Sequence, residues 1–196
     1  MAHKSTMEKL GLPAPGFELP NLNLEKGEKL VSLESFKEYP ALLVVFICNH
    51  CPYVVHIRDS FVNFVTEFQK KGLGVVAISS NDVESFPDDS PEKMSEEAAN
   101  YSYPFPYLFD ESQEIAKAYR AACTPDFFLY DKERNLVYRG QYDSSRPKNS
   151  VPVTGEDLRN ATNALLQGTV IPAEQMPSMG CNIKWKIGEE PDYFNT

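Results

Sequence analysis

The sequence has few basic residues and no long apolar run. Nineteen Lys and Arg residues stand against 28 Asp and Glu residues, which gives a formal net charge of −9. Because no basic cluster occurs, we expect neither nucleic acid nor an anionic membrane surface as a partner. The longest apolar run, residues 41–47, is far shorter than the roughly 20 residues that a membrane-spanning helix needs.

The first residues of the sequence lack the apolar segment of a signal peptide. Residues 1–6 are mostly polar, so we expect a cytoplasmic protein. Cysteine is also scarce, with four among 196 residues. In a reducing compartment, two cysteines at positions i and i+3 are more often catalytic or metal-binding than structural.

The length and composition predict one folded domain with two flanking segments. A chain of 196 residues with 42% hydrophobic residues is large enough to bury a core without crosslinks. Residues 1–12 are predicted to form a flexible N-terminal arm, and residues 13–168 an α/β domain. Residues 169–196 lack a helical period and are predicted to be an irregular C-terminal extension packed on the domain.

Two of the four cysteines, Cys48 and Cys51, stand between a predicted strand and a predicted helix. The apolar run at residues 41–47 is typical of a central strand that is buried on both faces. Pro52 suits the first turn of a helix, and apolar residues recur after it at helical spacing. The sequence therefore places both cysteines at the carboxyl end of a central strand, where open α/β sheets carry their chemistry.

The rest of the pattern predicts a mixed central sheet flanked by helices on both faces. A second apolar run at residues 74–79 predicts a strand parallel to the first. The other predicted elements are a short strand pair at residues 17–19 and 30–31, helices beginning at Pro91, after Asp110 and at Thr154, and a hairpin of residues 126–130 and 136–140.

The spacing of Cys48 and Cys51 predicts a redox-active dithiol. Residues at i and i+3 in one helical turn face the same way and are close enough for a disulfide. Unpaired N–H groups and the positive end of the helix dipole favour a thiolate there. We expect Cys48 to be the exposed nucleophile with a lowered pKa, and Cys51 to be the buried resolving thiol.

Asn49 and His50 lie between the cysteines and are expected to modulate them. A protonated His50 would stabilise the thiolate and make the site more oxidising, whereas a solvated, neutral histidine would not. Metal binding is the competing chemistry, because Cys48, His50, Cys51 and Cys123 are suitable ligands for zinc or a soft cation. Since a second spaced pair of ligands is missing, we expect no metal and no cofactor.

Taken with this motif, Thr124-Pro125 gives the chain a resemblance to the thioredoxin-like superfamily, over roughly residues 13–167. Residues 13–19 (Pro-Ala-Pro-Gly-Phe-Glu-Leu) look like the start of the redoxin (AhpC/TSA-type) branch. That branch includes thiol–disulfide oxidoreductases and peroxiredoxins. The resemblance implies a thioredoxin-like fold in which a threonine–cis-proline loop faces the CxxC motif. It makes Thr124 and Pro125 candidate substrate-binding residues.

The residues that activate peroxide in peroxiredoxins are missing from the matching positions. Peroxiredoxins carry a proline and a threonine ahead of the reactive cysteine and an arginine next to a later strand. If Cys51 is aligned with that cysteine, Val44, Cys48 and Pro125 occupy these three positions. The chain is most similar to a peroxiredoxin-like group that has a CxxC motif and a tail resembling residues 180–185. The resemblance therefore favours disulfide exchange.

Two further cysteines are possible additional redox thiols. Cys123 precedes Pro125 by two residues, and is interpreted as a third redox thiol, a metal ligand or a small buried residue. Cys181 lies in the extension, which could fold over the site and supply a second resolving thiol, although an isolated cysteine is often simply packed.

The function predicted from the sequence is thiol–disulfide oxidoreductase, acting through Cys48 and Cys51. The expected partners are protein or small-molecule disulfides and thiols, together with a reducing partner. The alternatives are a peroxiredoxin-like thiol peroxidase and a metal-binding thiol protein. The sequence leaves the oligomeric state open.

Overall fold

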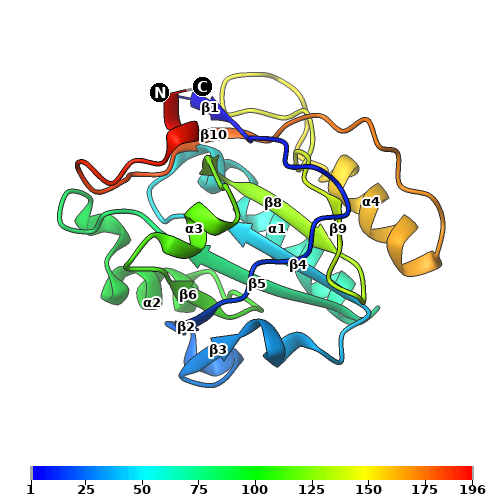
Figure 1. Ribbon diagram of the computed structural model, residues 1–196, viewed down its shortest axis with the longest axis horizontal. Coiled ribbons are helices and arrows are strands. Elements are labelled where there is room, and N and C mark those ends of the chain that lie inside the picture. Colours follow the sequence, from blue (N-terminus) through cyan, green and yellow to red (C-terminus); the bar gives the residue numbers. More distant parts are fainter. Residues whose placement is uncertain (1, 196) are drawn as a thin grey trace.

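Five strands form the central sheet of the computed structural model, which describes residues 2–195 (Figure 1). Their order is β6-β5-β4-β8-β9. β4 pairs in parallel with β5 and antiparallel with β8, so the sheet is mixed. The bounds are β4 Ala41–Phe46, β5 Leu73–Ser79, β6 Tyr107–Phe109, β8 Asp126–Tyr130 and β9 Leu136–Tyr138. The predicted α/β class with a mixed sheet is confirmed.

Helices cover both faces of this sheet (Figure 1). Their bounds are α1 Pro52–Gln69, α2 Pro91–Asn100, α3 Glu114–Ala118 and α4 Glu156–Gln167. The core on one face holds residues of α1, α2 and α4, and the core on the other holds residues of α3 and of the C-terminal extension. Among residues 2–195, no helix is both long enough and apolar enough to cross a bilayer.

The central strand β4 separates the two cores, as its continuous apolar sequence predicts. Leu43 and Val45 point into the core that contains α1, whereas Val44 and Phe46 point into the opposite one. All six residues of β4 are buried. Successive side chains of a strand alternate between faces, so a strand in this position must be apolar throughout.

Helix α1 begins with Pro52 at its first turn and buries one stripe of large side chains. The buried stripe consists of Val54, Ile57, Phe61, Phe64, Val65 and Phe68. This spacing of three and four residues is the one predicted from the sequence, and it holds the helix against the sheet. Because β4 ends just before α1 starts, residues 47–51 form the turn that carries the cysteines.

The two ends of the chain meet in a second, three-stranded antiparallel sheet. Its order is β1 (Ala2–Lys4), β10 (Met179–Asn182) and β7 (Cys123–Thr124). β1 lies within the segment predicted to be a flexible arm, residues 1–12, and β10 lies within the extension predicted to be irregular, residues 169–196. The pairing partners are far apart in sequence, so local patterns do not reveal them. Residues 1 and 196, which these predictions included, lie outside the described residues.

The remaining short elements lie around these sheets. β2 (Glu18–Pro20) and β3 (Leu30–Ser32) pair antiparallel, as predicted. The 3-10 helices are η1 Leu24–Lys26, η2 Leu33–Phe36, η3 Pro87–Asp89 and η4 Asp192–Asn195. Of these, η3 contributes to the site described below.

We predict that Phe64→Ala lowers the free energy of unfolding by about 3–5 kcal/mol. Phe64 is completely buried and packs against Phe68, with the two rings tilted and their centroids 4.6 Å apart. Val55→Ala is the matched control, because Val55 lies on the same helix but is 44% exposed. Denaturant unfolding of both variants measures the difference. Equal losses in the two variants would show that α1 does not pack on the sheet through this stripe.

Candidate active site

Cys48 and Cys51 lie in the turn between β4 and α1, at the carboxyl end of the central strand. Cys51 is the residue that caps α1. Both cysteines are reduced and buried, with 2% and 0% of their surface exposed. The position in the fold agrees with the prediction. The expectation that Cys48 is exposed is wrong, because Thr124 and the segment around β10 lie against the motif.

Thr124 contacts both sulfur atoms. Its hydroxyl Oγ1 is 3.5 Å from Cys48 Sγ, and its carbonyl oxygen accepts the S–H of a protonated Cys51 at 3.1 Å. The peptide bond from Thr124 to Pro125 is cis. The proline loop predicted to face the CxxC motif does so.

Cys48 and Cys51 are hydrogen-bonded to each other, and this bond dominates their ionisation. It raises the pKa of Cys48 well above its ordinary value, with burial and the charge of Asp89 acting in the same direction. The same bond lowers the pKa of Cys51 to about 5, against the opposing effect of burial. The Thr124 side chain and the backbone N–H groups of Cys181 and Val54 lower it further.

The two sulfurs therefore hold one proton between them at neutral pH, and the thiolate is favoured on Cys51. This distribution is the reverse of the one predicted from the sequence. The difference comes first from the hydrogen bond between the two thiols, which acts in opposite directions on the two pKa values. Thr124 and the backbone N–H of Cys181, which are distant in sequence, lower the pKa of Cys51 further.

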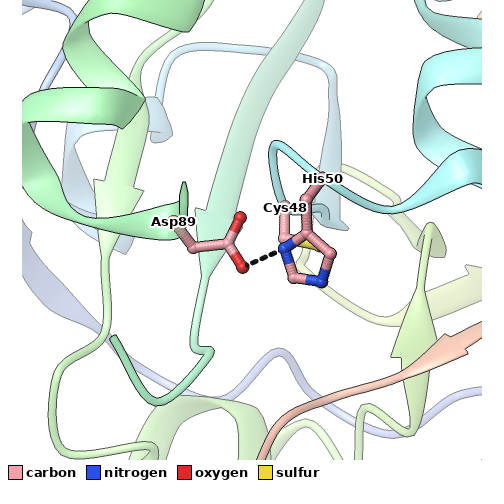
Figure 2. Close-up of side chains that lie close together, drawn as sticks. All are labelled: Cys48, His50 and Asp89. Atoms are coloured by element: carbon pink, nitrogen blue, oxygen red, sulfur yellow. Dashed lines mark ion pairs between the residues drawn. The ribbon is translucent and has the colours of Figure 1, made fainter. Parts of the chain in front are cut away.

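His50 forms an ion pair with Asp89, a residue that the sequence analysis did not single out. Figure 2 shows the carboxylate of Asp89 directed at the imidazole ring, with Cys48 beside it. His50 Nδ1 is 2.7 Å from Asp89 Oδ2, and the Asp89 side chain is completely buried. The hydrogen bond to Asp89 raises the pKa of His50, although burial opposes the shift. Of the two alternatives left open, the structure favours the protonated histidine.

Asp89 also holds the turn that carries the motif. Its Oδ1 accepts the backbone N–H of Asn49 at 2.8 Å, and its Oδ2 accepts the side-chain amide of Asn81 at 2.7 Å. Burial acts to raise the pKa of Asp89, but the hydrogen bonds from His50 and Asn81 outweigh it and lower the pKa. The Asn49 side chain is fixed in turn by Tyr107, whose hydroxyl donates to Asn49 Oδ1 at 3.0 Å.

A sequence signal for Asp89 does exist. It belongs to the acidic loop of residues 81–90, which follows β5. Since β5 is parallel to β4, the loop begins at the edge of the sheet where the cysteines lie. Spacing alone could not have selected Asp89 from the other acidic residues of that loop.

The two remaining cysteines differ in their relation to the motif. Cys123 is completely buried and donates its S–H to the Pro125 carbonyl oxygen at 3.6 Å; burial raises its pKa well above the ordinary value. Cys181 is only partly buried and lies opposite Thr124 in the pairing of β10 with β7. Both the thiol and the backbone N–H of Cys181 are hydrogen-bonded to the Cys51 sulfur.

One group of side chains has the composition of a metal site. Cys48, His50 and Asp89 each offer one ligand atom, and these atoms lie within 4.8 Å of one another. This set differs from the predicted one, because Asp89 takes part in it and neither Cys51 nor Cys123 does.

The fold and the paired thiols define a protein of the thioredoxin-like redoxin class. A family model described as the AhpC/TSA family matches residues 10–139. The chain belongs to this family, as the resemblance in the sequence implied, and the family indicates an oxidoreductase. Among curated proteins, none matches the chain.

Two solved structures are similar over nearly the whole chain. One is an uncharacterized conserved protein from Geobacillus kaustophilus, with 50% identity, a TM-score of 0.91, and 95% of this chain and 97% of that chain covered. The other is a hypothetical protein from Sinorhizobium meliloti, with 51% identity, a TM-score of 0.90, and coverages of 94% and 99%.

A thiol:disulfide interchange protein of the thioredoxin family from Chlorobium tepidum is more distant. It has 17% identity and a TM-score of 0.60, with coverages of 81% and 99%. At this identity, the likeness shows a shared fold.

We predict that Asp89→Asn lowers the pKa of His50, since the charged partner that favours the imidazolium is removed. Nuclear magnetic resonance titration of the His50 ring measures the shift. Asp88→Asn is the control, because it removes the same charge from an exposed neighbouring side chain. Equal His50 pKa values in the wild type and Asp89→Asn would contradict the ion pair.

The ionisation of the motif gives a second prediction. The ultraviolet absorbance of the thiolate should rise with pH around a midpoint of about 5, the pKa of Cys51. In Cys48→Ser the midpoint should move upward, because the largest effect that lowers this pKa is the hydrogen bond from Cys48. Cys123→Ala is the control and should keep the wild-type midpoint. A low midpoint that persists in Cys51→Ser would place the thiolate elsewhere.

Proposed function

We propose that the protein is a thiol–disulfide oxidoreductase that works through Cys48 and Cys51. The observation that carries the proposal is the pair of free thiols, Cys48 and Cys51, which lie at the start of α1 and both contact Thr124. A thiolate next to a neutral thiol supplies both the nucleophile and the resolving group that disulfide exchange needs. The proposed substrates are protein or small-molecule disulfides. We also propose a separate reducing partner and a cytoplasmic location.

The proposed reaction begins at Cys48. Cys48 adjoins His50, whose side chain is 28% exposed, whereas Cys51 lies beneath Thr124 and Cys181. The Cys48 proton passes along the hydrogen bond to Cys51, and the Cys48 thiolate attacks one sulfur of the substrate disulfide. A mixed disulfide forms, and the other substrate sulfur leaves as a thiolate.

Cys51 completes the exchange. Its thiol gives the proton to the substrate thiolate released in the first step, and its sulfur attacks Cys48 Sγ. The bond between Cys48 and the substrate breaks, and the second substrate sulfur leaves as a thiolate. The protein then holds a Cys48–Cys51 disulfide, and the substrate has gained two electrons. His50, whose pKa is raised by its hydrogen bond to Asp89, is positioned to give a proton to a leaving thiolate.

Thr124 and Pro125 are the proposed substrate-binding residues. The support for this role is their position against both sulfurs. A substrate that reaches Cys48 must pass close to the Thr124 hydroxyl.

Thiol peroxidase activity is the second candidate, and the low pKa of Cys51 favours it. Reduction of hydrogen peroxide requires a thiolate, and Cys51 would supply one at neutral pH. Against this candidate, Val44, Cys48 and Pro125 stand where the family's peroxide-activating residues would be. A metal-binding function rests only on the proximity of Cys48, His50 and Asp89.

We predict that Cys48→Ser and Cys51→Ser each lower the turnover of a small model disulfide by about a hundredfold or more, since both thiols are needed in the cycle. Cys51→Ser should accumulate a mixed disulfide between Cys48 and the substrate, visible by mass spectrometry. Cys123→Ala removes a thiol that the cycle does not use, and should keep the wild-type rate.

The same variants separate the alternatives. If hydrogen peroxide is reduced faster than the model disulfide, and Cys48→Ser keeps that activity, the protein is a peroxidase that uses Cys51. If anaerobically purified protein contains about one metal ion per chain, and the ion is lost in Asp89→Asn, the metal-binding candidate holds instead.

A further inference from the structure

Strand β10 of the C-terminal extension places a third thiol against the motif. β10 pairs antiparallel with β7, and this pairing sets Cys181 opposite Thr124. The Cys181 thiol and backbone N–H both reach the Cys51 sulfur. Cys51 is therefore in contact with two other thiols, Cys48 on its own turn and Cys181 on β10.

The position of β10 is closely determined by its neighbours. A side chain at Gly180 would overlap the Thr124 carbonyl oxygen, so the backbone of β10 lies directly on β7. The Ser178 hydroxyl donates to the Pro125 carbonyl oxygen at 2.6 Å, and the Ser5 N–H donates to the Ser178 carbonyl at 2.9 Å. On its other edge β10 pairs with β1. The contact between Cys181 and Cys51 is thus built into the fold.

The three thiols differ in access. Cys48 and Cys51 are buried, whereas Cys181 is partly exposed. A bulky reductant can therefore approach Cys181 more directly than either cysteine of the motif.

We propose that Cys181 is a third redox thiol, which takes over the disulfide by attacking Cys51 and presents it to the reductant. The inference rests on the proposed function, because it starts from the Cys48–Cys51 disulfide. The Cys181 thiol loses its proton, and its sulfur forms a bond with Cys51 Sγ. The bond between Cys48 and Cys51 breaks, and Cys48 leaves as a thiolate that takes up a proton. The number of disulfides is unchanged, so this step needs no other oxidant or reductant.

The electrostatics at Cys181 favour this transfer after the motif has been oxidised. In the reduced protein, burial, the negative charge on Cys51 and the hydrogen bond to it raise the pKa of Cys181 to about 11. Oxidation of Cys48 and Cys51 to a disulfide removes that charge, while Lys184 continues to favour the thiolate. The Cys181 pKa should then fall, so Cys181 becomes a better nucleophile once the motif is oxidised.

Peptide mapping tests the transfer. Trypsin is expected to leave Cys48 and Cys51 together in residues 38–58, Cys123 in 121–132 and Cys181 in 160–184. Full-length wild type, Cys48→Ser and Cys123→Ala are oxidised with glutathione disulfide, their free thiols are blocked, and the digests are analysed without reduction. Cys48→Ser should join peptide 38–58 to peptide 160–184. Wild type should show an internal disulfide in 38–58 first and the joined pair later, and Cys123→Ala should match it.

A kinetic experiment measures how fast a reductant re-reduces the disulfide. Cys181→Ser should still form the Cys48–Cys51 disulfide, but glutathione should re-reduce it about tenfold more slowly than the wild type. Cys123→Ser is the matched control and should be re-reduced at the wild-type rate.

Two results would overturn the transfer. One is the absence of a joined peptide in Cys48→Ser under conditions that oxidise the wild-type motif; the other is unchanged re-reduction of Cys181→Ser. Either result leaves the proposed function standing if wild type turns over the model disulfide. Failure of wild type to turn over the model disulfide contradicts the proposed function, and that is measured separately.

Discussion

The contacts of Thr124 link the motif turn to the C-terminal extension. Its hydroxyl lies at Cys48, its carbonyl oxygen is 3.1 Å from the Cys51 sulfur, and its backbone pairs with Cys181. One residue thus sets the distance between the turn, the proline loop and β10. Moving Thr124 would disturb all three sulfurs together, so the ionisation of the motif and the position of the extension are coupled.

The fold could be predicted from the sequence for those elements whose own apolar pattern shows which of their faces are buried. The apolar run of β4 and the stripe of α1 each carry their own periodicity, so the cysteine turn between them could be located. The strand Ala2–Lys4 and β10 could not be found in this way. They are short, and they form because of each other and β7, a relation that no local pattern records.

The site was predictable to the level of residue types, but not of ionisation. The spacing of Cys48 and Cys51 indicated a dithiol, and Thr124-Pro125 indicated the loop that faces it. Which sulfur holds the proton depends on the hydrogen bond between the two thiols and on donors from other segments, including the N–H of Cys181. The burial of Asp89 likewise depends on the tertiary structure, although the position of its loop follows from the parallel pairing of the strands.

The pairing of His50 with Asp89 bears on the direction of the chemistry. A lone imidazolium beside a thiolate would stabilise the reduced dithiol and make the site oxidising. Here the cation is matched by a buried carboxylate, and the charge of that carboxylate raises the pKa of Cys48. The pair therefore adds little net positive charge to the motif. The thiolate is stabilised instead by hydrogen bonds to Cys51, and the strongest of these comes from Cys48 itself.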